Sequence, residues 1–183
     1  MSRNYKIGNP SALYFITCTT TNWIDVFTRT DYADIFLECV RHCQKHKGLE
    51  VYAWCIMSNH AHLIIGSHGK HISDIMRDLK GYSSKKIVEE IRNNPKESRQ
   101  RWLLWLFQKE GRFNPNNKEF QFWQNGYHPI ELSSHEISMQ KLEYIHLNPV
   151  KAGLVEQAHH YRYSSAIDYE TGRKGMLELH KLG

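Results

Sequence analysis

Two short runs of β-forming residues lie close together in the first half of the chain, and they restrict its possible folds most strongly. Residues 50–56 (EVYAWCI) and 60–66 (HAHLIIG) are separated only by residues 57–59, which is hairpin length. We expect the two runs to pair as antiparallel strands. An aromatic and β-branched run at 13–20 (LYFITCTT) follows a turn signal and predicts an earlier strand, central in the same sheet.

A helix is predicted between that first strand and the hairpin, over Asp31 to Lys47. Its apolar positions recur at helical spacing: Ile35, Phe36, Cys39, Val40 and Cys43. Thr30 is available as the N-cap and Gly48 as the residue that ends the helix.

The later part of the chain continues the alternation of helices and strands. A second helical stretch begins near Ile72 and ends before Pro95. Residues 120–132 could supply another strand, and 134–147 predicts a helix with Ser133 or Ser134 as its cap.

The resulting order, β-α-β-β-α-β with a further helix, is the split βαβ arrangement. The predicted fold class is therefore α+β: a ferredoxin-like (RRM-like) antiparallel sheet with helices packed on it, plus a C-terminal helix that carries Tyr144. A length of 183 residues suits a single domain. We expect its core at about 12–166, an insert at about 85–118 and a tail at about 167–183.

Composition narrows the class of protein further. The chain has no apolar run of about 18 residues and no apolar N-terminal segment, so we expect a soluble, cytoplasmic protein with no membrane partner. Its four cysteines include no C-x-x-C pair, which predicts reduced core thiols. A net charge of +5 favours an anionic partner such as nucleic acid.

His60 and His62 form an H-x-H pair at the start of a predicted strand. Because side chains alternate between the two faces of a sheet, both imidazoles point to the same side and could share one metal ion. Imidazole suits transition metals, so Mg²⁺ or Mn²⁺ would need oxygen from a further ligand. The alternative is a pair of polar residues on an exposed strand face.

Tyr144 provides a second signal in the last predicted helix. Helical spacing places Met139, Leu142 and Ile145 on one stripe, whereas Tyr144 and Asn148 lie together away from it. Tyr144 could thus be a nucleophile beside a metal ligand, or simply an amphipathic surface aromatic. Before Pro149, Asn148 is also an excellent N-cap for a separate short helix that Gly153 would end.

Residues 52–65 (YAWCIMSNHAHLII) and 144–155 (YIHLNPVKAGLV) together resemble the metal-site strand and the tyrosine segment of single-tyrosine HUH transposases. The REP-associated tyrosine transposase branch, among the insertion-sequence transposases, is the most similar. The resemblance runs from about Leu13 to Ala166 and includes Phe122-Trp123-Gln124 and Tyr163-Ser164-Ser165-Ala166. It weakens over 85–118 and after Tyr169.

This resemblance implies a mechanism and a set of site residues. The metal ligands would be His60, His62 and Asn148, the ion Mg²⁺ or Mn²⁺, and the nucleophile Tyr144. Attack on single-stranded DNA near a hairpin would leave a 5′-phosphotyrosine link and a free 3′-hydroxyl, which stores the bond energy for rejoining. Because a phenol is a poor nucleophile at neutral pH, the phosphate must be polarised and the reacting atoms aligned.

The stretch from Arg77 to Lys118 has eleven basic residues against five acidic ones, interleaved with Trp102, Trp105 and Phe107. It could be a groove for DNA phosphates with rings for base stacking, or a solvated helix whose tryptophans pack inward. The DNA-contact candidates are Lys80, Lys85, Lys86, Arg99, Arg101 and Arg112. His128 could touch phosphate but fits a structural role better, and His146 should face away from Tyr144.

Two other functions stay open at this point. The chain could be a domesticated DNA-binding protein that no longer cleaves, or a metal-dependent phosphoesterase in which water attacks instead of tyrosine. No motif decides between a homodimer and a monomer.

Overall fold

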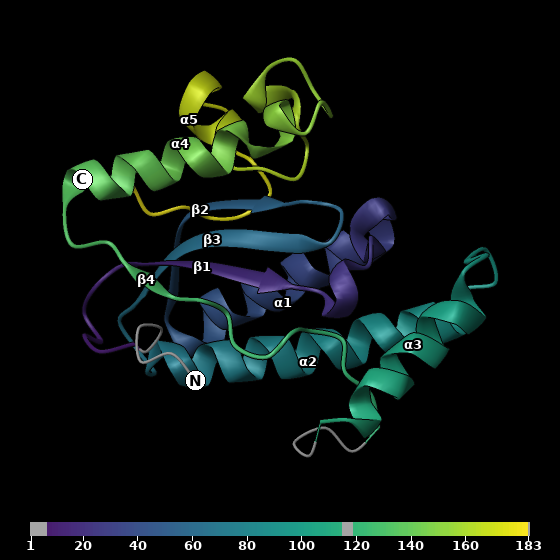
Figure 1. Ribbon diagram of the computed structural model, residues 1–183. Coiled ribbons are helices and arrows are strands. Elements are labelled where there is room, and N and C mark those ends of the chain that lie inside the picture. The colour runs from purple at the N-terminus through teal and green to yellow at the C-terminus, as the bar shows by residue number, and fades with distance from the viewer. Residues whose placement is uncertain (1–6, 115–118, 183) are drawn as a thin grey trace.

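The computed structural model describes residues 7–114 and 119–182, and these contain a four-stranded antiparallel sheet (Figure 1). The strands are β1 (Tyr14–Thr19), β2 (Leu49–Ile56), β3 (His60–Ser67) and β4 (Ile130–Glu131). Their spatial order is β2-β3-β1-β4, so β1 lies inside the sheet and β2 and β3 form the expected hairpin. The predicted ferredoxin-like α+β fold is confirmed.

Two helices, α1 (Thr30–Lys47) and α2 (Ile72–Asn93), cover one face of the sheet (Figure 1). Gly48 ends α1 in the left-handed conformation, with φ 73°, as predicted. The predicted N-cap is wrong by one residue: Arg29 occupies that position without a side-chain cap bond, and Thr30 is already helical.

The opposite face carries α4 (His135–Lys151) and the short α5 (Ala166–Thr171) (Figure 1). The Ser134 side chain caps α4 by accepting a hydrogen bond from the backbone N–H of Ile137.

The prediction that Asn148 caps a separate short helix is wrong, because α4 runs through Pro149 to Lys151. Pro149 has no N–H to donate to the Ile145 carbonyl, so the last turn of α4 lacks that one helical hydrogen bond. Asn148 itself makes an ordinary helical contact there, its carbonyl accepting from Ala152 N–H. Gly153, with φ 70°, ends the helix as predicted.

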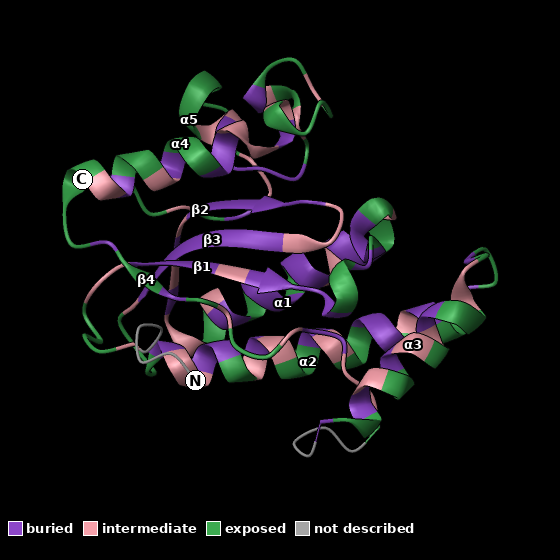
Figure 2. Ribbon diagram, in the orientation of Figure 1, coloured by how far each residue is buried: buried purple, intermediate pink, exposed green. Residues whose placement is uncertain are grey.

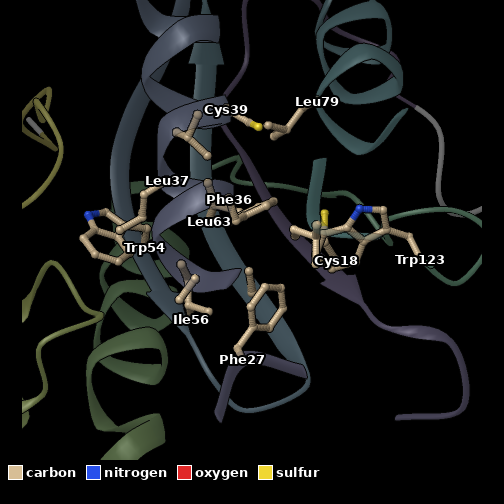
Figure 3. Packing of buried hydrophobic residues seen from close by; sticks show 14 of the residues in the cluster. Cys18, Phe27, Phe36, Leu37, Cys39, Trp54, Ile56, Leu63, Leu79 and Trp123 are labelled. Atoms are coloured by element: carbon tan, nitrogen blue, oxygen red, sulfur yellow. The ribbon is translucent and has the colours of Figure 1, made fainter. Parts of the chain in front are cut away.

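The two faces of the sheet bury separate apolar clusters. The larger one lies between the sheet and α1 and α2, and Figure 3 shows part of it, including Phe36, Leu37, Trp54, Leu63 and Trp123. The smaller one lies under α4 and consists of Phe15, Ala53, Cys55, Met57, Ile64, Leu132, Leu142 and Ile145. All four cysteines are buried free thiols, as predicted.

Helix α3 (Gln100–Arg112) extends from the end of α2 toward the edge of the molecule (Figures 1 and 2). It is anchored by the buried side chains of Leu103 and Phe107. Trp102 and Trp105 are half-exposed, so the interpretation in which these tryptophans pack inward is wrong.

Residues 120–132 contain much less strand than predicted. Only Ile130–Glu131 pair with β1, and Trp123 forms an isolated bridge with Thr20. Gly126 and His128 adopt positive φ angles of 76° and 44°, which breaks the extended backbone between these two points. Within the part of the chain that the structure describes, no helix combines the length and apolar character needed to cross a membrane.

Candidate active site

His60 and His62 lie on the sheet face that α4 covers. Period-two alternation turns the intervening Ala61 into the opposite core and leaves both imidazoles on one side. Their ring centroids are 4.6 Å apart with the planes at 71°. The predicted pairing of the two rings is therefore present in three dimensions.

The imidazole of His62 is held from the neighbouring strand. Thr17 lies directly opposite it in the β1–β3 register, and the Thr17 Oγ1 is 2.8 Å from His62 Nδ1. The other ring nitrogen, Nε2, is buried and has no hydrogen-bond partner. Burial, assisted by the positive charges of His60 and Lys141, lowers the pKa of His62 to about 3, so this ring is neutral at physiological pH.

The imidazole of His60 is held by the residue before it. Asn59 Oδ1 lies 2.6 Å from His60 Nδ1, while Asn59 Nδ2 donates to the Trp23 carbonyl. Because that second bond assigns the amide oxygen to the histidine, Nδ1 must carry the proton, which leaves Nε2 of His60 with a free lone pair. Burial also lowers the pKa of His60.

Helix α4 brings Tyr144 to this pair. Leu142 and Ile145 anchor the helix in the smaller cluster, and Tyr144 remains 42% exposed at its edge. The Tyr144 ring is edge-on to His62 at 5.3 Å between centroids, and to Phe15 at 5.9 Å. The prediction that Tyr144 lies off the packing stripe of its helix agrees with this exposure.

The packing stripe of α4 differs at one position from the prediction. Met139 is 43% exposed, and the buried set is Ser138, Leu142, Ile145, His146 and Pro149. The buried residues follow the i, i+3, i+4, i+7 rule from Leu142 onward, whereas Met139, one turn before Leu142, is exposed although its spacing places it near the same face.

Lys141 is a member of the site that the sequence interpretation missed. Its Nζ lies 5.0 Å from the ring centroid of Phe15 and 5.7 Å from that of Tyr144. The signal available in the sequence was its position three residues before Tyr144 in a helix, where side chains are neighbours.

Asn148 lies one turn after Tyr144 and is partly buried. Its role as a third metal ligand stays a prediction. Over residues 7–114 and 119–182, no group of three or more His, Cys, Asp or Glu side chains could hold a metal ion. Oxygen donors beyond the two histidines would therefore come from an amide such as that of Asn148, from water or from phosphate.

The two additional histidines differ in burial. His146 is buried and its Nε2 is 2.9 Å from Ser165 Oγ, so it faces away from Tyr144 as predicted. His128 is exposed in the loop before β4, and its role stays a prediction.

The DNA-contact candidates fall into two groups. Lys85, Lys86, Arg101 and Arg112 are exposed on α2 and α3. Lys80 instead donates to the carbonyls of Gln124 and Gly126, and Arg99 bonds to Glu97 and to the Asp25 carbonyl. These last two side chains are thus engaged within the protein.

Comparison with known proteins agrees with the fold and identifies the family. Residues 11–106 match the family model described as "Transposase IS200 like". Over 168 residues the chain is 26% identical to a Haemophilus influenzae protein assigned as a REP-associated tyrosine transposase, covering 90% of this chain and 85% of that protein.

A solved structure of a REP-associated tyrosine transposase bound to a REP hairpin shares the fold. It superposes with a TM-score of 0.67 at 17% identity, covering 100% of this chain and 94% of that one. The family match spans just over half of the chain and contains His60 and His62. The chain therefore belongs to the IS200-like transposase family.

Proposed function

We propose that this protein cuts and rejoins single-stranded DNA beside hairpins, with Tyr144 as the nucleophile. One observation carries the proposal: the Tyr144 ring contacts His62, whose Nε2 is buried and unpaired. A buried polar atom without a partner is costly, so a native site of this kind needs a ligand or a functional explanation.

The two histidines fit a divalent cation. Both Nδ1 atoms lie within hydrogen-bond distance of protein oxygens, and both rings are neutral at physiological pH. In the tautomer in which Nδ1–H donates to that oxygen, each Nε2 has a lone pair for coordination. We propose Mg²⁺ or Mn²⁺, with the Asn148 amide oxygen as a further donor. When bound, such an ion polarises the scissile phosphate.

Tyr144 would carry the covalent step. Its hydroxyl oxygen attacks the phosphorus, the bond from phosphorus to the 3′-oxygen breaks, and the phenolic proton is released as the 3′-hydroxyl forms. The product is a 5′-phosphotyrosine, which a new 3′-hydroxyl can attack to rejoin the strand. The Lys141 ammonium, beside the Tyr144 ring, places a positive charge next to the negative charge that develops on the reacting oxygens.

The partner that we propose is hairpin DNA with a single-stranded flank. The relative that shares the fold was solved with a REP hairpin, and this chain exposes Lys85, Lys86, Arg101 and Arg112 toward solvent. Trp102 and Trp105 add exposed rings on the same helix as Arg101.

The test is a denaturing gel of the protein with a labelled pool of DNA hairpins whose single-stranded flanks are randomised, in Mn²⁺. We expect a slow band that protease removes, and its loss in Tyr144→Phe. Tyr82→Phe is the matched control, since Tyr82 is an exposed tyrosine on α2.

Two results would reject the proposal. Binding without any adduct from the wild-type protein would indicate a DNA-binding protein that does not cleave. Cleavage that persists in Tyr144→Phe would indicate that water is the nucleophile.

A further inference from the structure

We propose that Trp23 is a stacking platform for one unpaired nucleobase next to the phosphate that Tyr144 attacks. This inference rests on the function proposed above and adds a nucleotide-binding subsite to it. The Trp23 side chain is 60% exposed, and its ring lies edge-on to His60 with centroids 6.4 Å apart. A large apolar ring is thus held in solvent directly beside the histidine pair.

The backbone that presents this ring is strained. Asn22 and Trp23 have φ angles of 51° and 55°, the left-handed region that is unfavourable for residues with a Cβ atom. Two consecutive residues of this kind persist only where the surrounding structure holds them, and such strain concentrates at functional sites.

Hydrogen bonds hold the turn in place. The Trp23 N–H donates to the Thr20 carbonyl at 3.1 Å, and the Thr20 hydroxyl donates to the Ile24 carbonyl at 2.8 Å. Ile24 is buried, whereas the ring of Trp23 points away from the core into solvent. The exposure of Trp23 therefore follows from a specified turn conformation.

Asn59 links this turn to the histidine pair. Its Nδ2 donates to the Trp23 carbonyl at 3.2 Å, and its Oδ1 accepts from His60 Nδ1 at 2.6 Å. A single amide thus sets both the orientation of the His60 ring and the position of the segment that carries Trp23.

The chemistry of single-stranded DNA matches such a ring. An unpaired base presents a π-face that stacks on aromatic side chains with little dependence on sequence. A base that flanks a phosphate at the histidine pair is within reach of a ring 6.4 Å from His60. Trp102 and Trp105 are also exposed, but they lie on α3, in the DNA-binding surface proposed above. Trp105→Ala therefore serves as a comparison for the position of the stacked base, and it can lower the affinity by itself.

The experiment measures binding in a Tyr144→Phe background, where the strand is not cut. Fluorescence anisotropy with labelled hairpin DNA in Mn²⁺ gives the dissociation constant for four proteins: the background alone and with Trp23→Ala, Trp23→Phe or Trp105→Ala. We expect Trp23→Ala to weaken binding by about 5- to 100-fold, and Trp23→Phe to retain most of the affinity.

An abasic site moved along the single-stranded flank identifies the stacked base. At one position it should weaken binding to the Tyr144→Phe protein as much as Trp23→Ala does, with no further loss when both changes are combined. The effects of Trp105→Ala and of the abasic site at that position should instead add. Trp23→Gly, which removes the ring and relieves the strained backbone, should reproduce the loss of affinity without a loss of thermal stability.

Two results would overturn the stacking proposal. One is wild-type affinity in Trp23→Ala, and the other is that the affinity losses from Trp23→Ala and from the abasic site add at every position of the flank. That failure is separable from failure of the tyrosine mechanism, because the covalent band is measured with Trp23 in place and the binding cycle requires no cleavage.

Discussion

The Tyr144 ring meets the His62 imidazole edge-on, with centroids 5.3 Å apart and planes at 68°. The two residues come from different layers, His62 from the sheet and Tyr144 from the helix that lies on it. Their contact depends on the apolar cluster in which Leu142 and Ile145 of α4 pack with Phe15 of β1. The site therefore forms only when the tyrosine helix docks on the sheet.

Removing the hydroxyl that holds His62 should weaken metal binding. Thr17→Val deletes the partner of Nδ1 while preserving shape, so the imidazole loses the hydrogen bond that orients it. We expect Mn²⁺ affinity to fall by about 10- to 100-fold, measured by calorimetry. Thr28→Val is the control, because the Thr28 hydroxyl donates to the Asp25 carbonyl and accepts from Arg99 Nη2, and it makes no hydrogen bond to the histidine pair. Unchanged affinity in Thr17→Val would contradict the proposed ligand geometry.

His146 should make the fold less stable in acid. Burial lowers its pKa to about 4, against an opposing effect of the Glu170 charge, whereas the unfolded chain takes up the proton near pH 6.5. Between these values the unfolded state binds more protons, so the free energy of unfolding falls as the pH falls, by up to about 1.4 kcal/mol per pH unit.

Urea denaturation at pH 7 and pH 5 checks this effect. His146→Gln should show a smaller loss of stability between the two pH values than the wild-type protein. His62, with its pKa also lowered, contributes in the same direction in both proteins. Equal losses in the two proteins would exclude His146 as a source of acid sensitivity.

Two helical glycines should respond to alanine in opposite directions. A Cβ at Gly111 would lie 2.6 Å from the Phe120 Cα, so Gly111→Ala must push α3 away from that segment. A Cβ at Gly81 meets nothing within 4 Å. By chemical denaturation we expect Gly111→Ala to lose about 1–3 kcal/mol and Gly81→Ala to gain about 0.5–1 kcal/mol. Similar effects at both sites would show that the α3 contact is loose.

Substitutions of Arg101 and Lys80 should affect different properties, the first DNA binding and the second the stability of the fold. The exposed Arg101 can neutralise a phosphate, so Arg101→Ala should weaken hairpin binding and reduce the salt dependence of the affinity by about one unit of slope. Lys80 bonds the carbonyls of Gln124 and Gly126, and burial lowers its pKa.

Lys80→Ala should therefore lower the free energy of unfolding by about 1–3 kcal/mol and leave the salt slope unchanged. Salt titrations of hairpin affinity and urea denaturation of both variants provide the measurements. An equal decrease in the salt dependence of affinity for the two variants would indicate that Lys80 also contacts a DNA phosphate.

Local patterns predicted much of the fold and part of the candidate site. The alternation of side chains in a strand put His60 and His62 on one face, and helical spacing put Tyr144 outside the packing stripe. The same patterns failed at Asn148, where cap propensity competed with continuation of α4, and at 120–132, where positive φ angles interrupt a β-prone run.

The sequence alone determined several local features through hairpin length, residue periodicity and turn residues. These features are the β2–β3 pairing, the pairing of the two imidazoles, and the helices that precede and follow the hairpin along the chain. Tertiary structure alone decided which side chains surround the histidine pair. Thr17 and Asn59 orient the two imidazoles, and Trp23 is exposed beside His60. It also decided that Lys141 lies beside Tyr144 and that Lys80 bonds to the loop at Gln124. The reason is physical: propensity and periodicity report the energetics of neighbours along the chain. Contacts between distant segments depend instead on how helices dock on the sheet and on which buried polar atoms then find partners.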